Sequence, residues 1–238
     1  NKVNPWGVNK KLLIVRAILG LIALFFMFES INRLPLATAT ILQYSYPTFT
    51  SISAFFLLKE NIGRKILAAI VLGWIGIVIV LEPNFLDSFS FKYEFNSVLI
   101  ALAGAFFTAL AYICVRKLSK DEKSLVIVNY FSVISALTTL PFVIVDGVLP
   151  VKFDILWLIG TGIAGQIGVI YITKGLTFIP ASQASSINYI QVFFAAIFGI
   201  ILFEESIKFS TFIGSLLILY SIILCLSKNK GELNTLIS

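Results

Sequence analysis

Eight long apolar segments follow one another along the chain, at residues 12–31, 36–58, 66–82, 97–115, 125–145, 155–173, 181–203 and 209–227. A helix needs about 20 mostly apolar residues to cross the hydrocarbon of a bilayer, and each segment meets or nearly meets this length. The longest link, residues 83–96, is too short for a soluble domain. Strands of a membrane β-barrel alternate apolar and polar residues, and stretches such as AIFGIILF do not. The sequence therefore predicts an all-α integral membrane protein, a bundle with eight visible transmembrane helices.

The charges support this count of spans. Only 13% of the residues are charged, against about 25% in a soluble domain. When the links are assigned alternately to two sides, one side holds 4 lysines and arginines and the other holds 14. The 14 are Lys2, Lys10, Lys11, Arg16, Lys59, Arg64, Lys65, Arg116, Lys117, Lys120, Lys123, Lys174, Lys228 and Lys230. The positive-inside rule then predicts that both termini are cytoplasmic. The net charge of +6 accordingly indicates membrane topology and no nucleic-acid partner.

The residue types present leave little for catalysis. The chain has no histidine, which excludes an HExxH zinc site and a Ser–His–Asp triad. Apart from Glu82 at the very end of the span at 66–82, only one carboxylate lies inside a predicted span, so an intramembrane enzyme is the least favoured class. A phosphate-binding GxxxxGK[ST] loop is absent as well, and no cofactor or metal is expected. The two cysteines, Cys114 and Cys225, fall inside predicted spans and are expected to be packing residues.

Residues 35–62 and 180–207 are copies of one another at a shift of 145 positions. They share 8 identities in 28, and Gln43 faces Asn188 in this register. An odd number of spans separates the copies, so the equivalent helices run in opposite directions, as in the inverted repeats of secondary transporters. The span at 97–115 has no partner copy upstream in the chain. We therefore expect a truncated ten-helix 5+5 inverted repeat, with an eight-span protein as the alternative.

The expected domains follow from this repeat. Residues 1–82 hold three helices of a first repeat that lacks its first two, residues 83–96 link the repeats, residues 97–227 form a second repeat of five helices, and residues 228–238 are a cytoplasmic tail.

The order of these elements resembles a known family. A link ending in "RLPLATA" or "FIPASQA" precedes a helix that closes on "LLKE" or "LFEES", and a final span follows. This pattern resembles the EamA-type transporters of the drug/metabolite transporter superfamily. The resemblance implies a secondary transporter in the bacterial inner membrane that moves a small organic metabolite or drug by alternating access. The implied partners are that solute and the lipid bilayer, and a homodimer is left open. A channel or a membrane scaffold is the alternative function.

Polar side chains form a stripe on both copies of the repeated helix, because positions i, i+3, i+4 and i+7 share a helix face. A buried amide without a partner costs several kcal/mol, so each stripe must face other helices or a watered cavity. Hydrogen bonds between helices would explain the stripes, and so would a substrate cavity between the repeats. The predicted substrate-binding residues are Thr40, Gln43, Tyr44, Tyr112, Gln166, Asn188, Tyr189 and Gln191.

Two further residues stand out within the spans. Apart from Glu82, Glu29 is the only acid inside one, near its outer end, and it could bind a proton or a cation or simply pair with Arg33 four residues along. Pro47 falls in the middle of the span at 36–58, where it is expected to kink the helix. Its counterpart is Val192, so the two halves are not expected to be fully symmetric. Asp121 and Glu122 are expected in a solvated loop.

Overall fold

The computed structural model describes residues 7–34, 36–60, 63–81, 95–147, 150–151, 153–190, 194 and 209–226. Every regular element in these ranges is a helix. They are α1 (Lys10–Arg33), α2 (Leu36–Gln43), α3 (Tyr46–Ser53), the π-helix η1 (Ala54–Leu58), α4 (Arg64–Leu81), α5 (Phe95–Leu118), α6 (Ser124–Asp146), α7 (Phe153–Phe178), α8 (Ala181–Ile187) and α10 (Phe209–Leu226).

The expectation of an all-α membrane bundle is confirmed at this level. Helices long and apolar enough to cross a membrane are Lys10–Arg33, Phe95–Leu118, Ser124–Val145 and Phe153–Phe178. Helices α4 and α10 have 18 residues each and cover the predicted spans 66–82 and 209–227. The span predicted at 36–58 is divided into α2, α3 and η1. Of the span predicted at 181–203, the described part is α8 with the residues just after it.

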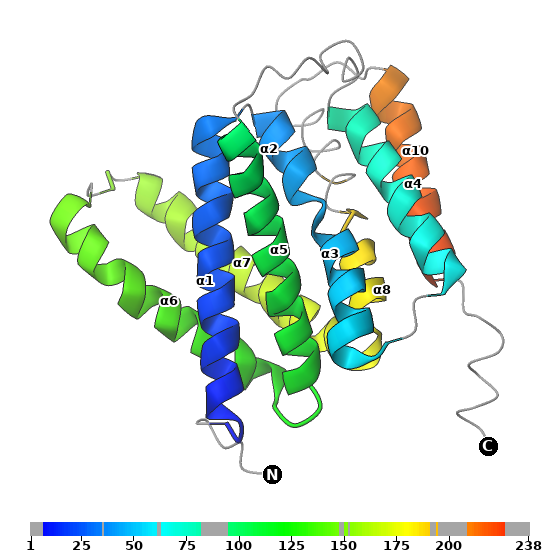
Figure 1. The fold of residues 1–238 in the computed structure, drawn as a ribbon. Helices are drawn as coiled ribbons and strands as arrows, with labels where there is room; N and C mark the ends of the chain where they lie inside the picture. The colour runs from blue at the N-terminus through cyan, green and yellow to red at the C-terminus, as the bar shows by residue number, and fades with distance from the viewer. Residues whose placement is uncertain are drawn as a thin grey trace.

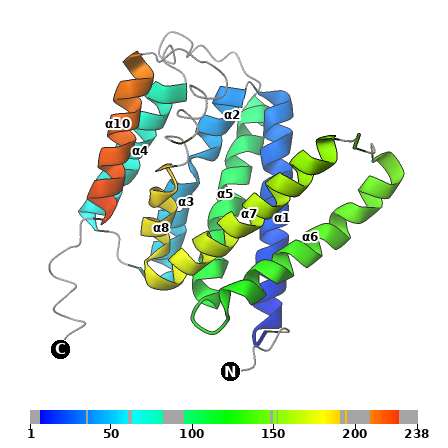
Figure 2. The ribbon, with the colours of Figure 1, turned by 180° about the vertical axis from the view of Figure 1, so that it is seen from behind.

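The helices form three groups (Figure 1). On one side α1 runs beside α5, in the middle α3 packs against α8, and on the other side α4 pairs with α10. Helices α6 and α7 lie behind α1 and α5 and diverge from one another toward one end of the bundle (Figure 2). The start of α1 and the end of α10 lie at the same end.

Small side chains let α1 and α5 approach closely. Ala101, Ala105 and Ala109 are fully buried and recur every four residues, so they form one flat stripe along α5. A Cβ on Gly104, in the same helix, would stand 3.3 Å from the backbone nitrogen of Met27 in α1. Between membrane helices, such small residues allow the backbone contact that replaces the hydrophobic effect as the source of stability.

The pairing of α4 with α10 depends on glycine in the same way. A Cβ on Gly76 would lie 2.8 Å from the carbonyl oxygen of Gly214 and 2.8 Å from Cγ1 of Ile218. Close by, the Ser221 hydroxyl donates a hydrogen bond to the carbonyl of Ala69 at 2.6 Å. The two helices are therefore held by direct contact of their backbones, which only glycine at position 76 permits.

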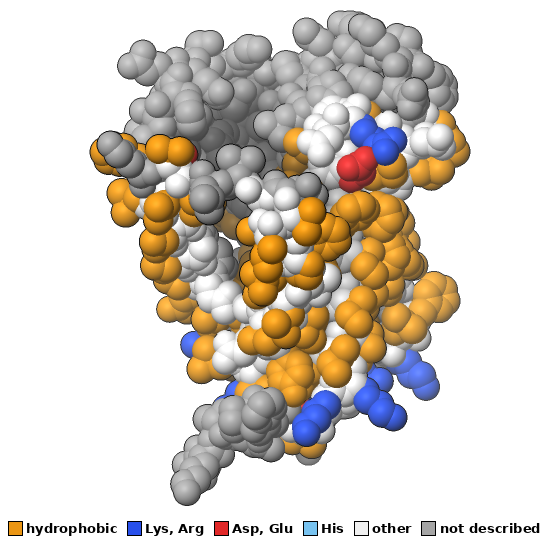
Figure 3. All heavy atoms as spheres, turned by 90° about the vertical axis from the view of Figure 1, so that its left-hand side faces the viewer, with side chains coloured by type: hydrophobic (Ala, Val, Ile, Leu, Met, Phe, Trp, Pro, Cys, Tyr) orange, Lys and Arg blue, Asp and Glu red, His pale blue; other side chains and the backbone are white. Residues whose placement is uncertain are grey.

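Lysine and arginine side chains gather at the end of the bundle where α1 begins, while the long sides of the bundle are apolar (Figure 3). This end contains the start of α1, the link from η1 to α4, and the link from α5 to α6. Its basic residues include Lys10, Lys11, Lys59, Arg64, Lys65, Arg116, Lys117, Lys120 and Lys123.

One acid at the basic end differs from expectation. Glu122 is 8% exposed, so the prediction that it is solvated is wrong. Its carboxylate accepts hydrogen bonds from the backbone nitrogens of Val8 and Asn9, the latter at 2.7 Å. The negative charge therefore satisfies free N–H groups just before the first turn of α1, where a helix dipole favours an anion. Its neighbour Asp121 is exposed, as expected.

Candidate functional site: a polar cavity inside the bundle

The middle of the bundle contains two interrupted helices. Helix α2 ends at Gln43, and Tyr44 and Ser45 form a turn before α3 begins at Tyr46. Pro47 is in the first turn of α3, and it has no N–H to continue the hydrogen bonds of α2. The distortion expected at Pro47 is therefore a two-residue interruption just before the proline, where Ser45 keeps a helical conformation but bonds to the Leu42 carbonyl three residues back.

The segment that aligns with it at a shift of 145 residues is also interrupted, one position earlier in that alignment. Helix α8 ends at Ile187, and Asn188 and Tyr189 form a turn. Their backbone nitrogens bond to carbonyls three residues back, Asn188 to Ser185 at 3.3 Å and Tyr189 to Ser186 at 3.2 Å. Val192, the counterpart of Pro47, lies outside the described residues. The described part of this turn, Asn188 and Tyr189, contains no proline. Gln43 and Asn188, which face each other in the repeat register, thus both lie at the end of a half-helix.

Both amides line one cavity, which we call the amide chamber. It has a volume of about 350 Å³ and lies between α1, the break after α2, α5, α7 and the end of α8. Its lining comprises Leu24, Met27, Ser30, Ile31, Ala39, Thr40, Gln43, Tyr44, Tyr46, Thr108, Tyr112, Ile172 and Asn188.

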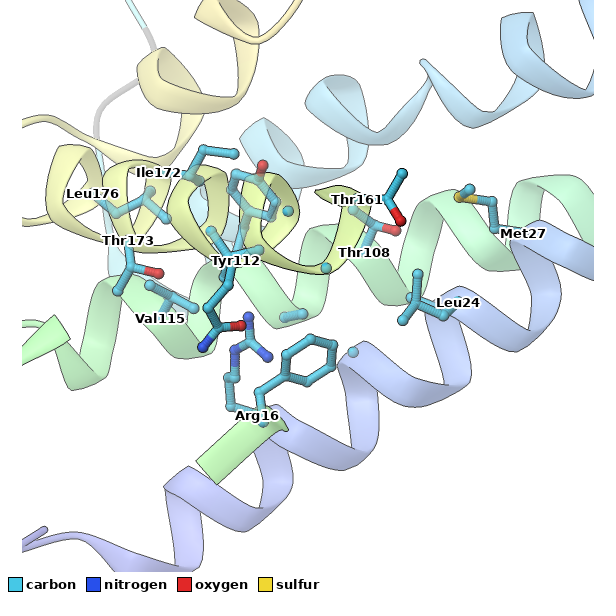
Figure 4. A pocket seen from close by; sticks show the side chains of 18 residues that line it. Arg16, Leu24, Met27, Thr108, Tyr112, Val115, Thr161, Ile172, Thr173 and Leu176 are labelled. Carbon is cyan, nitrogen blue, oxygen red and sulfur yellow. The ribbon is translucent and has the colours of Figure 1, made fainter. Parts of the chain in front are cut away.

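A second cavity continues from it toward the basic end, and we call it the arginine chamber. It has a volume of about 400 Å³ and is lined by residues of α1, α5, α6 and α7, including Arg16, Phe131, Gln166 and Thr173 (Figure 4). The two chambers share five lining residues, which are Leu24, Met27, Thr108, Tyr112 and Ile172. They are therefore neighbouring parts of one hollow.

Helix α5 supplies hydrogen-bond partners to both amides. Gln43 donates from Nε2 to the Thr108 hydroxyl at 3.1 Å, and Asn188 donates from Nδ2 to the Tyr112 hydroxyl at 2.6 Å. The amides therefore form hydrogen bonds between helices, and they also line the chamber, whose role as a substrate cavity stays a prediction. The Gln43 carbonyl oxygen is buried and has no hydrogen-bond partner among the described residues. A buried acceptor of this kind is available to a solute or to water.

Tyrosine rings surround the end of α8. The ring centroids of Tyr46 and Tyr112 are 5.6 Å apart, and those of Tyr44 and Tyr189 are 6.3 Å apart. Tyr44, Tyr46 and Tyr112 line the amide chamber. Tyr189 is fully buried and lines neither chamber, because its ring fills the space beside Gly73 of α4, where a Cβ would stand only 2.3 Å from it.

Of the other predicted site residues, two line a chamber, one lies outside the described residues and one lies away from both chambers. Thr40 lines the amide chamber, and Gln166 lines the arginine chamber, where its Oε1 accepts a hydrogen bond from Ser132 at 3.1 Å. Gln191 lies outside the described residues. Glu29 lines neither chamber, and its carboxylate pairs with Arg33 Nε at 2.6 Å near the far end of α1.

Arg16 is a chamber residue that the sequence pattern alone did not reveal. Counting it among the charges that flank the spans was wrong, because it is 8% exposed and lines the arginine chamber. The signal was present in the sequence, since Arg16 lies inside the apolar run LLIVRAIL. A charge one and a half turns inside a span is more typical of a cavity than of a membrane surface.

Below the arginine chamber, at the basic end, the first and second parts of the chain are joined by a charged contact. Arg116 Nε donates to Glu60 Oε1 at 3.3 Å, and Arg116 Nη1 donates to the Leu176 carbonyl at 2.7 Å. Glu60 also accepts from the backbone nitrogen of Ala181, the first residue of α8, at 3.0 Å. Lys59, with φ of 55°, makes the left-handed turn after η1 that precedes Glu60. These contacts link η1, α5, α7 and α8 at the end of the hollow.

Long apolar helices around an internal hollow that carries a few polar side chains are typical of a multi-pass membrane protein. The chain belongs to the EamA-like transporter family, whose model matches residues 1–82 and 95–227. This confirms the resemblance drawn from the repeated link and helix motifs, and it makes the protein a transporter of the drug/metabolite type.

Several relatives are similar over most of the chain. An uncharacterized transporter of Helicobacter pylori (strain J99 / ATCC 700824) is 27% identical over 218 residues, which cover 89% of this chain and 72% of the relative. The S-adenosylmethionine uptake transporter of Rickettsia prowazekii (strain Madrid E) is 25% identical over 225 residues, covering 93% and 74%. The pseudopaline exporter CntI of Pseudomonas aeruginosa (strain UCBPP-PA14) is 27% identical over 224 residues, covering 92% and 76%.

A protein crystal structure is similar in fold. It aligns with a TM-score of 0.75 at 20% sequence identity, over 89% of this chain and 76% of that chain. At this identity the similarity concerns the fold alone.

Proposed function

We propose that the protein is a secondary transporter that carries a small organic metabolite across a bacterial inner membrane by alternating access. The observation that carries the proposal is the pair of amides, Gln43 and Asn188, that end two half-helices on a shared hollow of the bundle. Transporters of several folds bind their solutes at such helix interruptions near the middle of the bilayer. Thr40, Gln43, Tyr44, Tyr112, Gln166 and Asn188 are the proposed solute contacts.

We propose that the contact between Glu60 and Arg116 closes the hollow at the basic end of the bundle. It joins residues 56 positions apart and ties η1 to α5, while Arg116 also holds the last turn of α7. We propose that these bonds separate when a solute leaves the hollow toward the basic end. With both termini in the cytoplasm, as the excess of lysine and arginine favours, this closed end would be the cytoplasmic one.

We also propose that the complete transporter has two sets of five helices. In the repeat register Gly20 of α1 matches Gly165 of α7. Helix α1 packs along both α5 and α6, whereas the membrane-spanning window of α7 is 0% buried among the described residues. A Cβ added at Gly160 or Gly168 of α7, which line neither chamber, would meet nothing described within 4 Å. Two further helices packed on α7 would give it the neighbours that α1 has.

Reconstitution of the full-length protein into liposomes tests the transport proposal. Uptake and efflux of labelled metabolites would be measured, with S-adenosylmethionine included because one relative is named for it. Gln43→Ala combined with Asn188→Ala should lower transport at least tenfold without loss of folded protein. Each side-chain amide would lose a hydrogen bond to the solute, and such a bond is worth about 1 kcal/mol. Asn129→Ala is the matched control, because it removes an exposed amide from α6 outside both chambers. Transport by the double variant at the parental rate would refute the proposed site.

A further inference from the structure

Arg16 is a buried cation for which the described residues provide no ion-pair partner. It is 8% exposed, and its guanidinium points from α1 across the arginine chamber toward Tyr112 of α5 (Figure 4). The Nε and Nη1 atoms are fully buried and have no hydrogen-bond partner among the described residues. A buried charge without a partner costs several kcal/mol. A ligand that paired with the guanidinium would remove this cost and would therefore bind strongly.

The one favourable contact described for the guanidinium is aromatic. Its central carbon lies 4.3 Å from the centroid of the Phe131 ring on α6. Such a cation–π contact contributes about 0.5 to 2 kcal/mol, which is less than the cost of burying the charge. The ring covers one face of the guanidinium, and the N–H groups of Nε and Nη1 still lack a hydrogen-bond partner among the described residues.

None of the 18 residues that line the chamber is an acid. Two carboxylates at the basic end are engaged elsewhere, Glu60 with Arg116 and Glu122 with the backbone before α1, and a third, Asp121, is exposed. The partner of Arg16 is therefore not among the described side chains of the chamber, although the chamber has room for a solute of some size, at about 400 Å³.

We infer that the arginine chamber binds a small organic anion, whose carboxylate accepts hydrogen bonds from the unpaired N–H groups of Arg16. A planar guanidinium suits a carboxylate because two parallel N–H···O bonds can form between them. Gln166 and Thr173 offer further polar contacts from α7, and Leu24, Met27 and Ile172 offer an apolar wall to the rest of the solute. This inference rests on the proposed function and adds the substrate class, a carboxylate with an apolar body.

A phospholipid headgroup carries the same oxyanion chemistry and could reach Arg16 between α6 and α7. An acid on a segment outside the described residues could also pair with it. The experiment has to separate both cases from a soluble carboxylate.

Thermal unfolding of the full-length protein in nanodiscs of neutral phosphatidylcholine provides the test. The probes are isosteric pairs that differ in charge, benzoate against benzamide and glutarate against glutaramide. Each carboxylate should raise the unfolding temperature of the parent, while its amide should not. Arg16→Gln should weaken the apparent affinity for the carboxylate about 10- to 100-fold, since a hydrogen bond to a charged group is worth about 1.5 to 3 kcal/mol. Arg16→Lys should retain part of it, because the charge remains and the planar fork is lost.

Lys11→Gln is the matched control, because it removes one charge from the same helix at an exposed position. It should leave the response to carboxylates unchanged. Equal responses to acid and amide, or an Arg16→Gln response equal to that of the parent, would overturn the inference. So would stabilisation that requires phosphatidylglycerol in the nanodisc, which would identify a lipid as the partner. The inference would also be overturned if no carboxylate changed the unfolding temperature of the parent while Arg16→Gln was strongly destabilised. That result would identify an acid of the protein itself as the partner of Arg16.

Transport and anion recognition fail separately. If carboxylates bind in an Arg16-dependent manner but liposomes carry no labelled solute, the proposed function fails and the anion site remains. If neutral solutes are carried equally well by the parent and by Arg16→Gln, transport stands and the anion site fails.

Discussion

Arg116 of α5 and Glu60, which follows η1, form a partly buried ion pair, with Nε and Oε1 3.3 Å apart. The side chains are 21% and 15% exposed, so water screens their attraction less than at a surface. The same carboxylate accepts a hydrogen bond from the backbone N–H of Ala181, the first residue of α8. This bond connects the start of α8 to the residue that follows η1.

Glu60→Gln should lower the free energy of unfolding by about 1 to 3 kcal/mol, because the amide loses the charge and places an N–H group against other donors. Glu29→Gln is the matched control, since its ion pair with Arg33 is more exposed, at 30% and 45%, and should contribute less than about 1 kcal/mol. Thermal unfolding in detergent measures both. Equal effects of the two substitutions would show that the Glu60 contact adds no stability beyond a surface pair.

The hydrogen bond from Asn188 to Tyr112 should be visible as energetic coupling. Tyr112→Phe and Asn188→Ala remove the same 2.6 Å bond from its two ends, so their combined effect on solute affinity should be smaller than the sum of the separate effects. We expect a coupling energy of about 1 kcal/mol, measured by a double-mutant cycle on transport or binding. Strict additivity would mean that the two side chains act independently.

Gly76→Ala should separate α4 from α10. The added methyl group would meet the Gly214 carbonyl and Ile218 at 2.8 Å, which is closer than such contacts allow. Overpacking of this kind costs about 1 to 3 kcal/mol and should lower the unfolding temperature. Gly175→Ala is the control, because a Cβ there meets nothing within 4 Å. A Gly76→Ala protein as stable as the control would contradict the close packing of these helices.

A bulky residue on the open face of α7 tests the proposed ten-helix architecture. If two further helices pack on this face, Gly168→Leu in the full-length protein should cost about 1 to 3 kcal/mol of stability through overpacking. Ala136→Leu, at an exposed position of α6, should cost little. Both variants would be compared by thermal unfolding, and indifference to leucine at position 168 would indicate that lipid faces this side of α7.

Glu29 pairs with Arg33 outside both chambers, so we expect it to anchor the far end of α1 and to carry no proton for transport. The rate of solute uptake by Glu29→Gln should therefore keep the parental dependence on pH. Uptake into liposomes at several external pH values measures this. A shifted or flattened profile would restore Glu29 as a coupling group.

The long helices could be predicted from the sequence because each is a long, nearly uninterrupted apolar run. The span predicted at 97–115 is α5, Phe95–Leu118, and the span predicted at 12–31 is α1, Lys10–Arg33. The small differences at the ends arise because polar residues continue a helix past its apolar part. The break at Tyr44 and Ser45 was anticipated only as a kink, since Pro47 marks where hydrogen bonding fails but not how far the helix unwinds.

Contacts between distant residues could not be predicted. Glu122 lies in a loop that reads as charged and solvated, and only the folded chain brings the backbone of Val8 and Asn9 to it across more than 110 positions. Arg16 was read by its charge alone, and its burial became evident once α6 and α7 were placed beside α1. The family matched by the chain confirms the resemblance, whereas the roles of the chamber residues remain predictions.

The ring of Tyr189 lies in the gap left by Gly73, one position after the amide that ends α8. Trp74 packs in the same cluster, together with Ile77 and Ile218. A rearrangement of the turn formed by Asn188 and Tyr189 would move this ring and change the surroundings of the Trp74 indole. With Trp6 and Trp157 replaced, the fluorescence of Trp74 would therefore report a solute's arrival at this turn without any attached label.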